Sequence, residues 1–105
     1  MEIIRNRTDA EFCIALEGRL DTTTAPQLEA VLKDELGDAS ALKFDFTKLE
    51  YISSAGLRVL LATQKTMNKQ GTMTIVGVNS TIMEVFDITG FLDILTVEPA
   101  PKSEA

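Results

Sequence analysis

The segment ALKFDFTKLEYISSAGLRVLL, residues 41–61, joins a strand pattern to a helix pattern through two serines. Residues 41–47 alternate apolar and polar side chains, which is the period of two that a strand requires. After Ser54, apolar residues recur at the spacing of a helix that is buried on one face, and the pattern closes at Gly71. We therefore expect a strand, a short loop with Ser53 and Ser54, and an amphipathic helix.

Similar patterns lie on both sides of this segment. Thr-Asp-Ala separates two short apolar runs and predicts the turn of an antiparallel hairpin. Threonines and an early proline open a helical pattern that ends on Gly37. The expected strands outside the first segment cover residues 2–7, 11–18, 72–78 and, at the end, 94–98, and the expected helices lie within residues 22–37 and 79–90.

This order of elements predicts an α/β fold. Two opening strands are followed by helices and strands in alternation, which implies right-handed crossovers between parallel strands of one sheet. We expect a mixed sheet of four to five strands with packed helices, in a single domain over residues 1–98. Residues 99–105, PAPKSEA, are expected to form a flexible tail.

The composition limits the partners and the compartment. The chain has 105 residues, of which 45% are apolar and 25% charged, with a net charge of −6. This charge repels nucleic acid and anionic lipid surfaces, so neither is expected as a partner. No run approaches the roughly 18 apolar residues of a membrane span, and no cleavable signal is recognisable, so we expect a cytoplasmic protein. The single cysteine, Cys13, lies in an apolar run and is expected to pack as a small hydrophobe.

The absence of histidine argues against most catalytic sites. It removes Ser-His-Asp and Cys-His nucleophiles and the usual zinc ligand sets. The glycines do not form a GxxxxGK[ST] or GxGxxG phosphate loop. We therefore expect no metal and no cofactor.

The two serines have a structural and a functional interpretation. Either hydroxyl could cap the helix by accepting a hydrogen bond from an N–H group of the first turn. Alternatively, one serine caps while the other stays exposed, where the partial positive charge of the helix N-terminus would favour a phosphate. The small residues Ala55 and Gly56 allow close approach of a partner, although Gly56 could equally serve tight packing against the sheet.

Three segments, EGRLD at 17–21, FDFTKLEYISSAGLRVLL at 44–61 and GTMTIVGVNSTIMEVFDITGF at 71–91, resemble the STAS domain of anti-sigma-factor antagonists. The resemblance implies the STAS fold and a protein without catalytic activity. It also implies that an anti-sigma factor serine kinase phosphorylates one serine and that a serine phosphatase reverses this. In such proteins the unphosphorylated form binds the kinase and releases the sigma factor.

The resemblance also places the site. When Gly56 and Leu57 are matched to the family motif, the phosphorylated serine falls on Ser54, with Ser53 as the alternative acceptor. Ser53 stands where well-studied antagonists carry an aspartate, a difference that bears on which kinase recognises the loop. The expected partner-binding residues are Ser53, Ser54, Ala55, Gly56, Leu57 and Arg58.

Two acidic residues, Asp21 and Asp45, match acidic family positions near the same end of the sheet. Solvated loop carboxylates or turn caps explain them equally well. We name them as neighbours of the site, and we expect the free protein to be a monomer.

Two other functions remain open at this point. A stand-alone STAS protein could regulate a different signalling or transport complex. An enzyme could use Ser54 as a nucleophile, but without histidine only Asp45, Asp21 or a lysine could act as its base.

Overall fold

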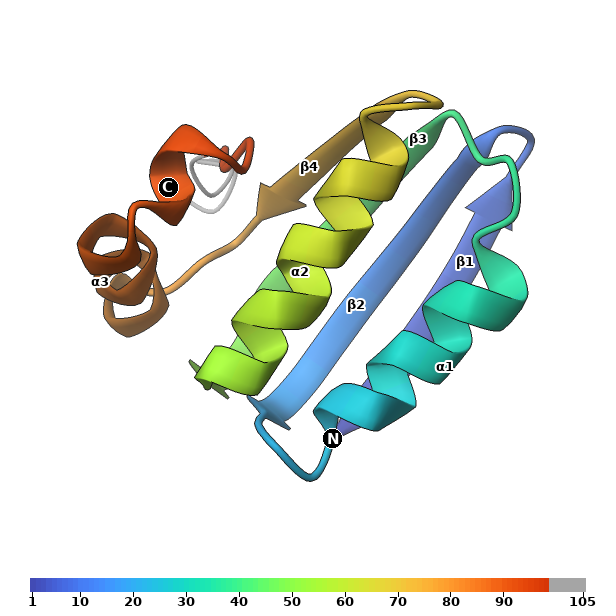
Figure 1. The fold of residues 1–105 in the computed structure, drawn as a ribbon. Coiled ribbons are helices and arrows are strands. Elements are labelled where there is room, and N and C mark those ends of the chain that lie inside the picture. Colours follow the sequence, from blue (N-terminus) through green and yellow to red (C-terminus); the bar gives the residue numbers. More distant parts are fainter. Residues whose placement is uncertain (99–105) are drawn as a thin grey trace, which may run out of the picture.

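Four strands form one sheet in the order β1-β2-β3-β4 in the computed structural model, which describes residues 1–98 (Figure 1). β1 pairs with β2 antiparallel, whereas β2 with β3 and β3 with β4 pair parallel. The expected mixed α/β sheet is therefore confirmed. The strands are β1 (Glu2–Thr8), β2 (Glu11–Leu20), β3 (Ala41–Ile52) and β4 (Thr72–Val76).

β3 is longer than predicted, because it continues past residue 47 to Ile52. Its pairing with β4 ends at Asp45. Its pairing with β2 continues after two register shifts, the first before Lys48 opposite Glu17 and the second before Tyr51 opposite Arg19. The shifts break the alternation of side chains on which the sequence-based limit depended. The second half of β3 carries the chain to the loop with the two serines.

Both crossover helices cover the same face of the sheet (Figure 1). α1 (Ala25–Glu35) connects β2 to β3, and α2 (Ser54–Met67) connects β3 to β4. Right-handed crossovers between parallel strands that follow one another across a sheet place their helices on one side. The N-terminal ends of α1 and α2 consequently lie at the same edge, beside the ends of β2 and β3.

The third helix, α3 (Ser80–Thr89), follows β4 and lies beyond that side of the sheet (Figure 1). Asn79 caps α3, because its side-chain oxygen accepts a hydrogen bond from the Ile82 N–H at 2.8 Å. The amide nitrogen of Asn79 donates to the Leu49 carbonyl at 3.0 Å, which attaches α3 to β3. Gly90 ends α3 in the left-handed conformation that glycine favours, and the short 3-10 helix η1 (Phe91–Asp93) follows.

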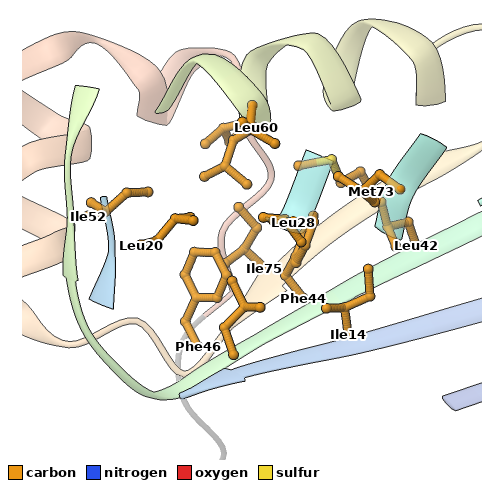
Figure 2. Packing of buried hydrophobic residues seen from close by; sticks show 14 of the residues in the cluster. Ile14, Leu20, Leu28, Leu42, Phe44, Phe46, Ile52, Leu60, Met73 and Ile75 are labelled. Atoms are coloured by element: carbon orange, nitrogen blue, oxygen red, sulfur yellow. The ribbon is translucent and has the colours of Figure 1, made fainter. Parts of the chain in front are cut away.

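The core lies between the two crossover helices and the sheet (Figure 2). Phe44 and Phe46 project from β3 with their ring centroids 5.7 Å apart, and Leu60 of α2 lies on the same side of the sheet (Figure 2). Leu57 and Leu60 are buried, whereas Leu61 is only half-buried. Other core side chains are Phe12, Ile14, Leu16, Leu20, Leu28, Leu42, Met73 and Ile75.

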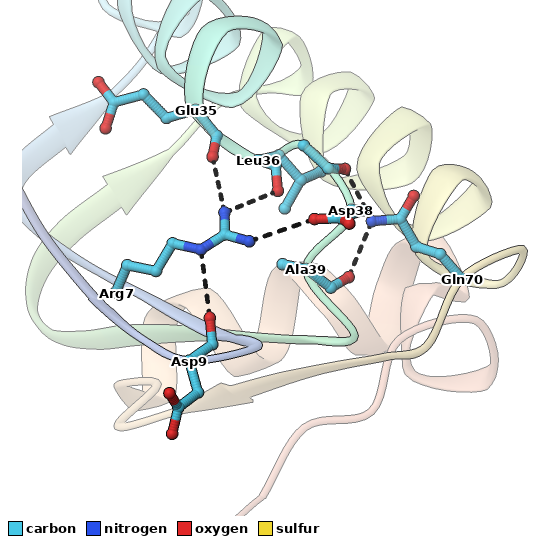
Figure 3. Close-up of polar contacts among 8 residues, drawn as sticks. Arg7, Asp9, Glu35, Leu36, Asp38, Ala39 and Gln70 are labelled. Carbon is cyan, nitrogen blue, oxygen red and sulfur yellow. Dashed lines mark hydrogen bonds and ion pairs between the residues drawn. The ribbon is translucent and has the colours of Figure 1, made fainter.

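Arg7 joins the hairpin to the end of α1 (Figure 3). Its guanidinium donates to the carbonyls of Glu35 and Leu36, both at 3.1 Å, and approaches the Asp38 carboxylate at 3.5 Å. Gln70, just after α2, donates to two carbonyls of the same loop, those of Gly37 and Ala39 (Figure 3). The terminal carbonyls of α1, which have no partner within the helix, thus gain side-chain donors.

The remaining predictions concern the C-terminal segment and the cysteine. The expected final strand is reduced to one parallel bridge between Ile75 and Val97. The predicted tail, residues 99–105, lies outside the described residues.

Cys13 is half-buried and lies opposite Lys43, and thus on the sheet face that α1 and α2 leave uncovered. Burial raises the pKa of its thiol. Within residues 1–98, no helix has the length and apolar character needed to cross a membrane.

Candidate functional site

The loop with the two serines is short and firmly attached to the sheet. Ser53 occupies the N-cap position of α2 in an extended conformation, and Ser54 is the first residue of the helix. The Ser53 N–H donates to the Leu20 carbonyl at 2.9 Å, which fixes the loop to the end of β2. The first backbone hydrogen bond of α2 runs from the Leu57 N–H to the Ser53 carbonyl, at 3.0 Å. The N–H groups ahead of Leu57 therefore have no partner in the helix.

Neither serine caps α2. No side-chain hydrogen bond is made at the N-cap, so the capping interpretation is wrong for Ser53. The Ser53 hydroxyl oxygen is buried and has no hydrogen-bond partner among the described residues. Ser54, by contrast, is exposed. The hydroxyl that is open to another protein is therefore that of Ser54, directly beside the unpaired N–H groups of the helix start.

The other expected contact residues divide into exposed and buried ones. Arg58 is exposed and Ala55 is half-buried, so both can meet a partner. Gly56 and Leu57 are buried. A Cβ atom at Gly56 would lie 2.8 Å from side-chain carbons of both Ile52 and Leu20, which is too close for any larger residue. Gly56 thus serves the packing of α2 against the strand ends, the structural role considered for it from the sequence.

The two acidic neighbours both stabilise turns. A side-chain oxygen of Asp21 accepts hydrogen bonds from the backbone N–H groups of Thr23, at 3.0 Å, and Thr24, at 3.1 Å. These bonds, led by that of Thr24, hold the pKa of Asp21 below its ordinary value. Asp45 accepts from the Thr47 N–H at 2.9 Å and from the Thr47 hydroxyl at 2.6 Å. The turn-cap interpretation therefore holds for both residues.

Only one of the two carboxylates lies near the serine loop in the sheet. Asp21 directly follows Leu20, the residue to which Ser53 is bonded. Asp45 lies in the first half of β3, opposite Ala15 and Val76, and its neighbours Phe44 and Phe46 both point into the core. Asp45 is thus level with the end of β4, whereas β3 itself continues to Ile52 before the serine loop begins.

Sequence reasoning missed a basic and aromatic pair beside the loop. Arg19 and Tyr51 are opposite each other in the β2–β3 register, and the guanidinium carbon lies 4.3 Å from the centroid of the Tyr51 ring. Arg19 also pairs with Asp21, with Nε to Oδ2 at 3.8 Å. The pairing depends on the register shifts in β3, which the sequence pattern does not reveal. It places a cation near the strand ends that hold Ser53.

A shallow hollow of about 390 Å³ adjoins the loop, between the starts of α1 and α2. Ala55 and Arg58 line it from α2, and Ala25, Pro26 and Glu29 line it from α1. Among the described residues, no group of three or more Asp, Glu, Cys or His side chains is placed to hold a metal ion. The arrangement therefore offers a hydroxyl, unpaired N–H groups and a small hollow for protein contact.

The family model of the STAS domain matches residues 2–103. Among curated proteins, the chain is 33% identical over 107 residues to BtrV of Bordetella bronchiseptica, described as a candidate anti-sigma factor antagonist, covering 100% of this chain and 92% of that protein. It is 30% identical over 105 residues to the anti-sigma-B factor antagonist of Bacillus subtilis, covering 99% and 93% of the two chains. The chain belongs to the STAS domain family, among the anti-sigma-factor antagonists.

Solved structures share the fold. An anti-sigma factor antagonist from Mycobacterium paratuberculosis superposes with a TM-score of 0.84 at 23% identity, over 98% of this chain and 87% of that chain. SpoIIAA from Bacillus, solved in its phosphorylated form, gives a TM-score of 0.75 at 20% identity, over 98% and 95% of the two chains. At these identities the likeness establishes the shared architecture alone.

Proposed function

We propose that this protein is a phosphorylation-switched binding module whose switch residue is Ser54. In its unphosphorylated form it binds an anti-sigma factor that is also a serine kinase, and this binding releases the sigma factor. Phosphate on Ser54 breaks the contact, and a serine phosphatase restores it. The protein itself catalyses nothing in this scheme.

One observation carries the proposal: the exposed hydroxyl of Ser54 lies at a helix start that no side chain caps. An N-terminal helix end carries about half a positive charge and donates N–H groups, so it accommodates a phosphate. The buried Ser53 hydroxyl cannot be reached by a kinase without opening the loop. The geometry thus favours Ser54 over Ser53 as the acceptor.

The electrostatics explain how binding and folding can respond differently. A phosphoserine adds about −1.5 to −2 charges near neutral pH. In the free protein the start of α2 and Arg58, which is exposed one helical turn further along, can offset this charge. In an interface with a partner, the same charge must be dehydrated and therefore weakens binding. The switch then acts on association while the fold stays nearly unchanged.

The proposal is tested by intact-mass measurement of the protein isolated from its own cells, followed by peptide mapping. We expect part of the population to carry one phosphate, located on Ser54. A Ser54→Ala variant expressed in the same cells should carry none. A phosphate on the Ser54→Ala variant, or none on the natural protein under any growth condition, would overturn the assignment.

Ser53→Ala is the matched control, because it removes the neighbouring hydroxyl while leaving Ser54 and the backbone in place. We expect phosphorylation of this variant to be reduced in part, since the loop beside the acceptor has changed, but not abolished. Complete loss in Ser53→Ala together with full retention in Ser54→Ala would move the switch to Ser53.

A further inference from the structure

The stretch from residue 70 to residue 101 carries charges of one sign only. From residue 70 to residue 101 there is no lysine or arginine, whereas Glu84, Asp87, Asp93 and Glu98 supply four carboxylates. None of these four forms an ion pair with another residue of the described part, 1–98. Within the described residues, the negative charge of this region therefore has no ion-pair partner.

Large apolar side chains are exposed in the same segment. Ile88 of α3 is 79% exposed, Ile94 is 46% exposed and Leu92 of η1 is 39% exposed. A hollow of about 500 Å³ brings Leu92 together with Met83, Glu84 and Asp87. We call the residues Met83, Glu84, Asp87, Ile88, Leu92 and Ile94 the α3–η1 surface. It lies beyond the β4 side of the sheet, away from α1 (Figure 1).

We propose that the α3–η1 surface docks a partner-protein segment in which lysine or arginine accompanies leucine-like side chains. The apolar side chains would bury against their counterparts, and the carboxylates would pair with the cations. The α3–η1 surface shares no residue with the Ser54 loop, and the inference does not depend on the proposed switch.

Three other occupants fit less well. A second copy would bring the same carboxylates face to face, and like charges oppose such contact. An anionic lipid surface is repelled for the same reason. The segment PAPKSEA, residues 99–105, contains no leucine, isoleucine, valine, phenylalanine or methionine with which to cover Ile88. A basic and apolar partner segment satisfies both features of the surface.

The test measures binding of a synthetic helical peptide with leucines on one face and lysines on the other, by fluorescence anisotropy at moderate salt. We expect the Glu84→Lys/Asp87→Lys double variant to bind this peptide at least about tenfold more weakly than the natural protein. Ile88→Ser should also weaken binding several-fold while the thermal midpoint stays unchanged, since Ile88 is exposed. A peptide with glutamate in place of lysine should not bind.

The matched control is Asp34→Lys/Glu50→Lys, which makes the same change in net charge at two other exposed acidic residues. We expect it to weaken binding less than about twofold. Equal weakening by both double variants would mean attraction to the overall negative charge and would overturn the proposal. The same holds if no peptide binds, or if removal of residues 99–105 tightens binding about tenfold, since the tail would then be the natural occupant.

Discussion

Ser53 and Asn79 occupy equivalent positions before two helices but behave differently. Asn79 caps α3, whereas the Ser53 hydroxyl is buried and makes no hydrogen bond with the described residues. A buried hydroxyl without a partner costs stability, and its removal relieves that cost. Because the Ser53 side chain makes no cap hydrogen bond, the start of α2 is left open.

We therefore expect opposite effects from two alanine substitutions. Asn79→Ala should lower the free energy of unfolding by about 0.5 to 2 kcal/mol, because it removes a cap. Ser53→Ala should leave it unchanged or raise it by up to about 1 kcal/mol. Urea unfolding of both variants checks this. A loss of stability in Ser53→Ala as large as that in Asn79→Ala would mean that Ser53 caps α2 in solution.

Asp21 makes the loop before α1 sensitive to acid. Its folded-state pKa lies below the ordinary value of 3.8, mainly because the Thr24 N–H donates to the carboxylate. A depressed folded-state pKa means that the stabilisation is present above the unfolded pKa and is lost as the pH falls through the folded pKa. The affected range therefore lies below about pH 4.

We expect Asp21→Asn to lower the thermal midpoint at pH 6 by more than it does at pH 2.5. As the pH falls the natural aspartate takes up a proton and loses the charge that Asn lacks, so the difference between the two proteins should shrink. Thermal unfolding followed by circular dichroism over this range is the measurement. A difference that stays constant with pH would show that the charge of Asp21 does not contribute.

The helices and strands show which features the sequence determines. The helix limits at Gly37 and Gly90, the Asn79 cap and the hairpin turn were predictable, because each depends on neighbouring residues alone. The extent of β3 could not be predicted, since its second half is held by pairing with β2 after two register shifts. Likewise, the Arg19–Tyr51 contact required the register of two strands distant in sequence. Local signals were sufficient for the elements but not for their pairing.

The same distinction applies to the candidate site. Ser54 was identified from its place before a helical pattern and from a family resemblance, and the structure places it exposed at the helix start. The burial of the Ser53 hydroxyl could not be predicted, and packing of Gly56 was one of two alternatives, because both depend on where Leu20 and Ile52 lie. Burial is set by tertiary packing, which residue type predicts only on average.

The connection between the hairpin and α1 depends on the forked shape of the Arg7 side chain. One guanidinium nitrogen donates to the carbonyls of both Glu35 and Leu36, and another approaches Asp38 (Figure 3). Lysine has the same charge but only a point-like ammonium group, so it cannot reproduce this geometry.

We expect Arg7→Lys to lower the free energy of unfolding by about 1 kcal/mol, and Arg7→Ala by slightly more. Arg5→Lys is the control, because Arg5 makes a single ion pair with Glu35 at 3.2 Å, which a lysine can replace. Hydrogen exchange of the last turn of α1 should be accelerated in the Arg7 variants only. If the lysine substitutions at Arg5 and Arg7 lowered the free energy of unfolding equally, the positive charge and not the guanidinium geometry would stabilise this connection.

For the molecule as a whole, the switch requires that association and stability can be changed separately. Ser54 is exposed at the end of α2, whereas Leu60 is fully buried in the core between α2 and the sheet (Figure 2). Ser54→Asp adds a negative charge at the positive end of the helix, which should stabilise the fold by about 0.3 to 1 kcal/mol. Leu60→Ala leaves a cavity and should cost about 2 to 5 kcal/mol.

If the proposed function is right, Ser54→Asp changes binding affinity without loss of stability, and Leu60→Ala changes stability without loss of binding affinity. Ser54→Asp should weaken binding to the cognate anti-sigma factor while its thermal midpoint stays equal or rises, because the charge must be dehydrated only in the interface. Leu60→Ala should lose stability but, at a temperature where it remains folded, bind as the natural protein does. Calorimetric titration with thermal unfolding of the same samples measures both. If Ser54→Asp binds with unchanged affinity while folded, the start of α2 is not the interface, because a charge placed there could not escape dehydration.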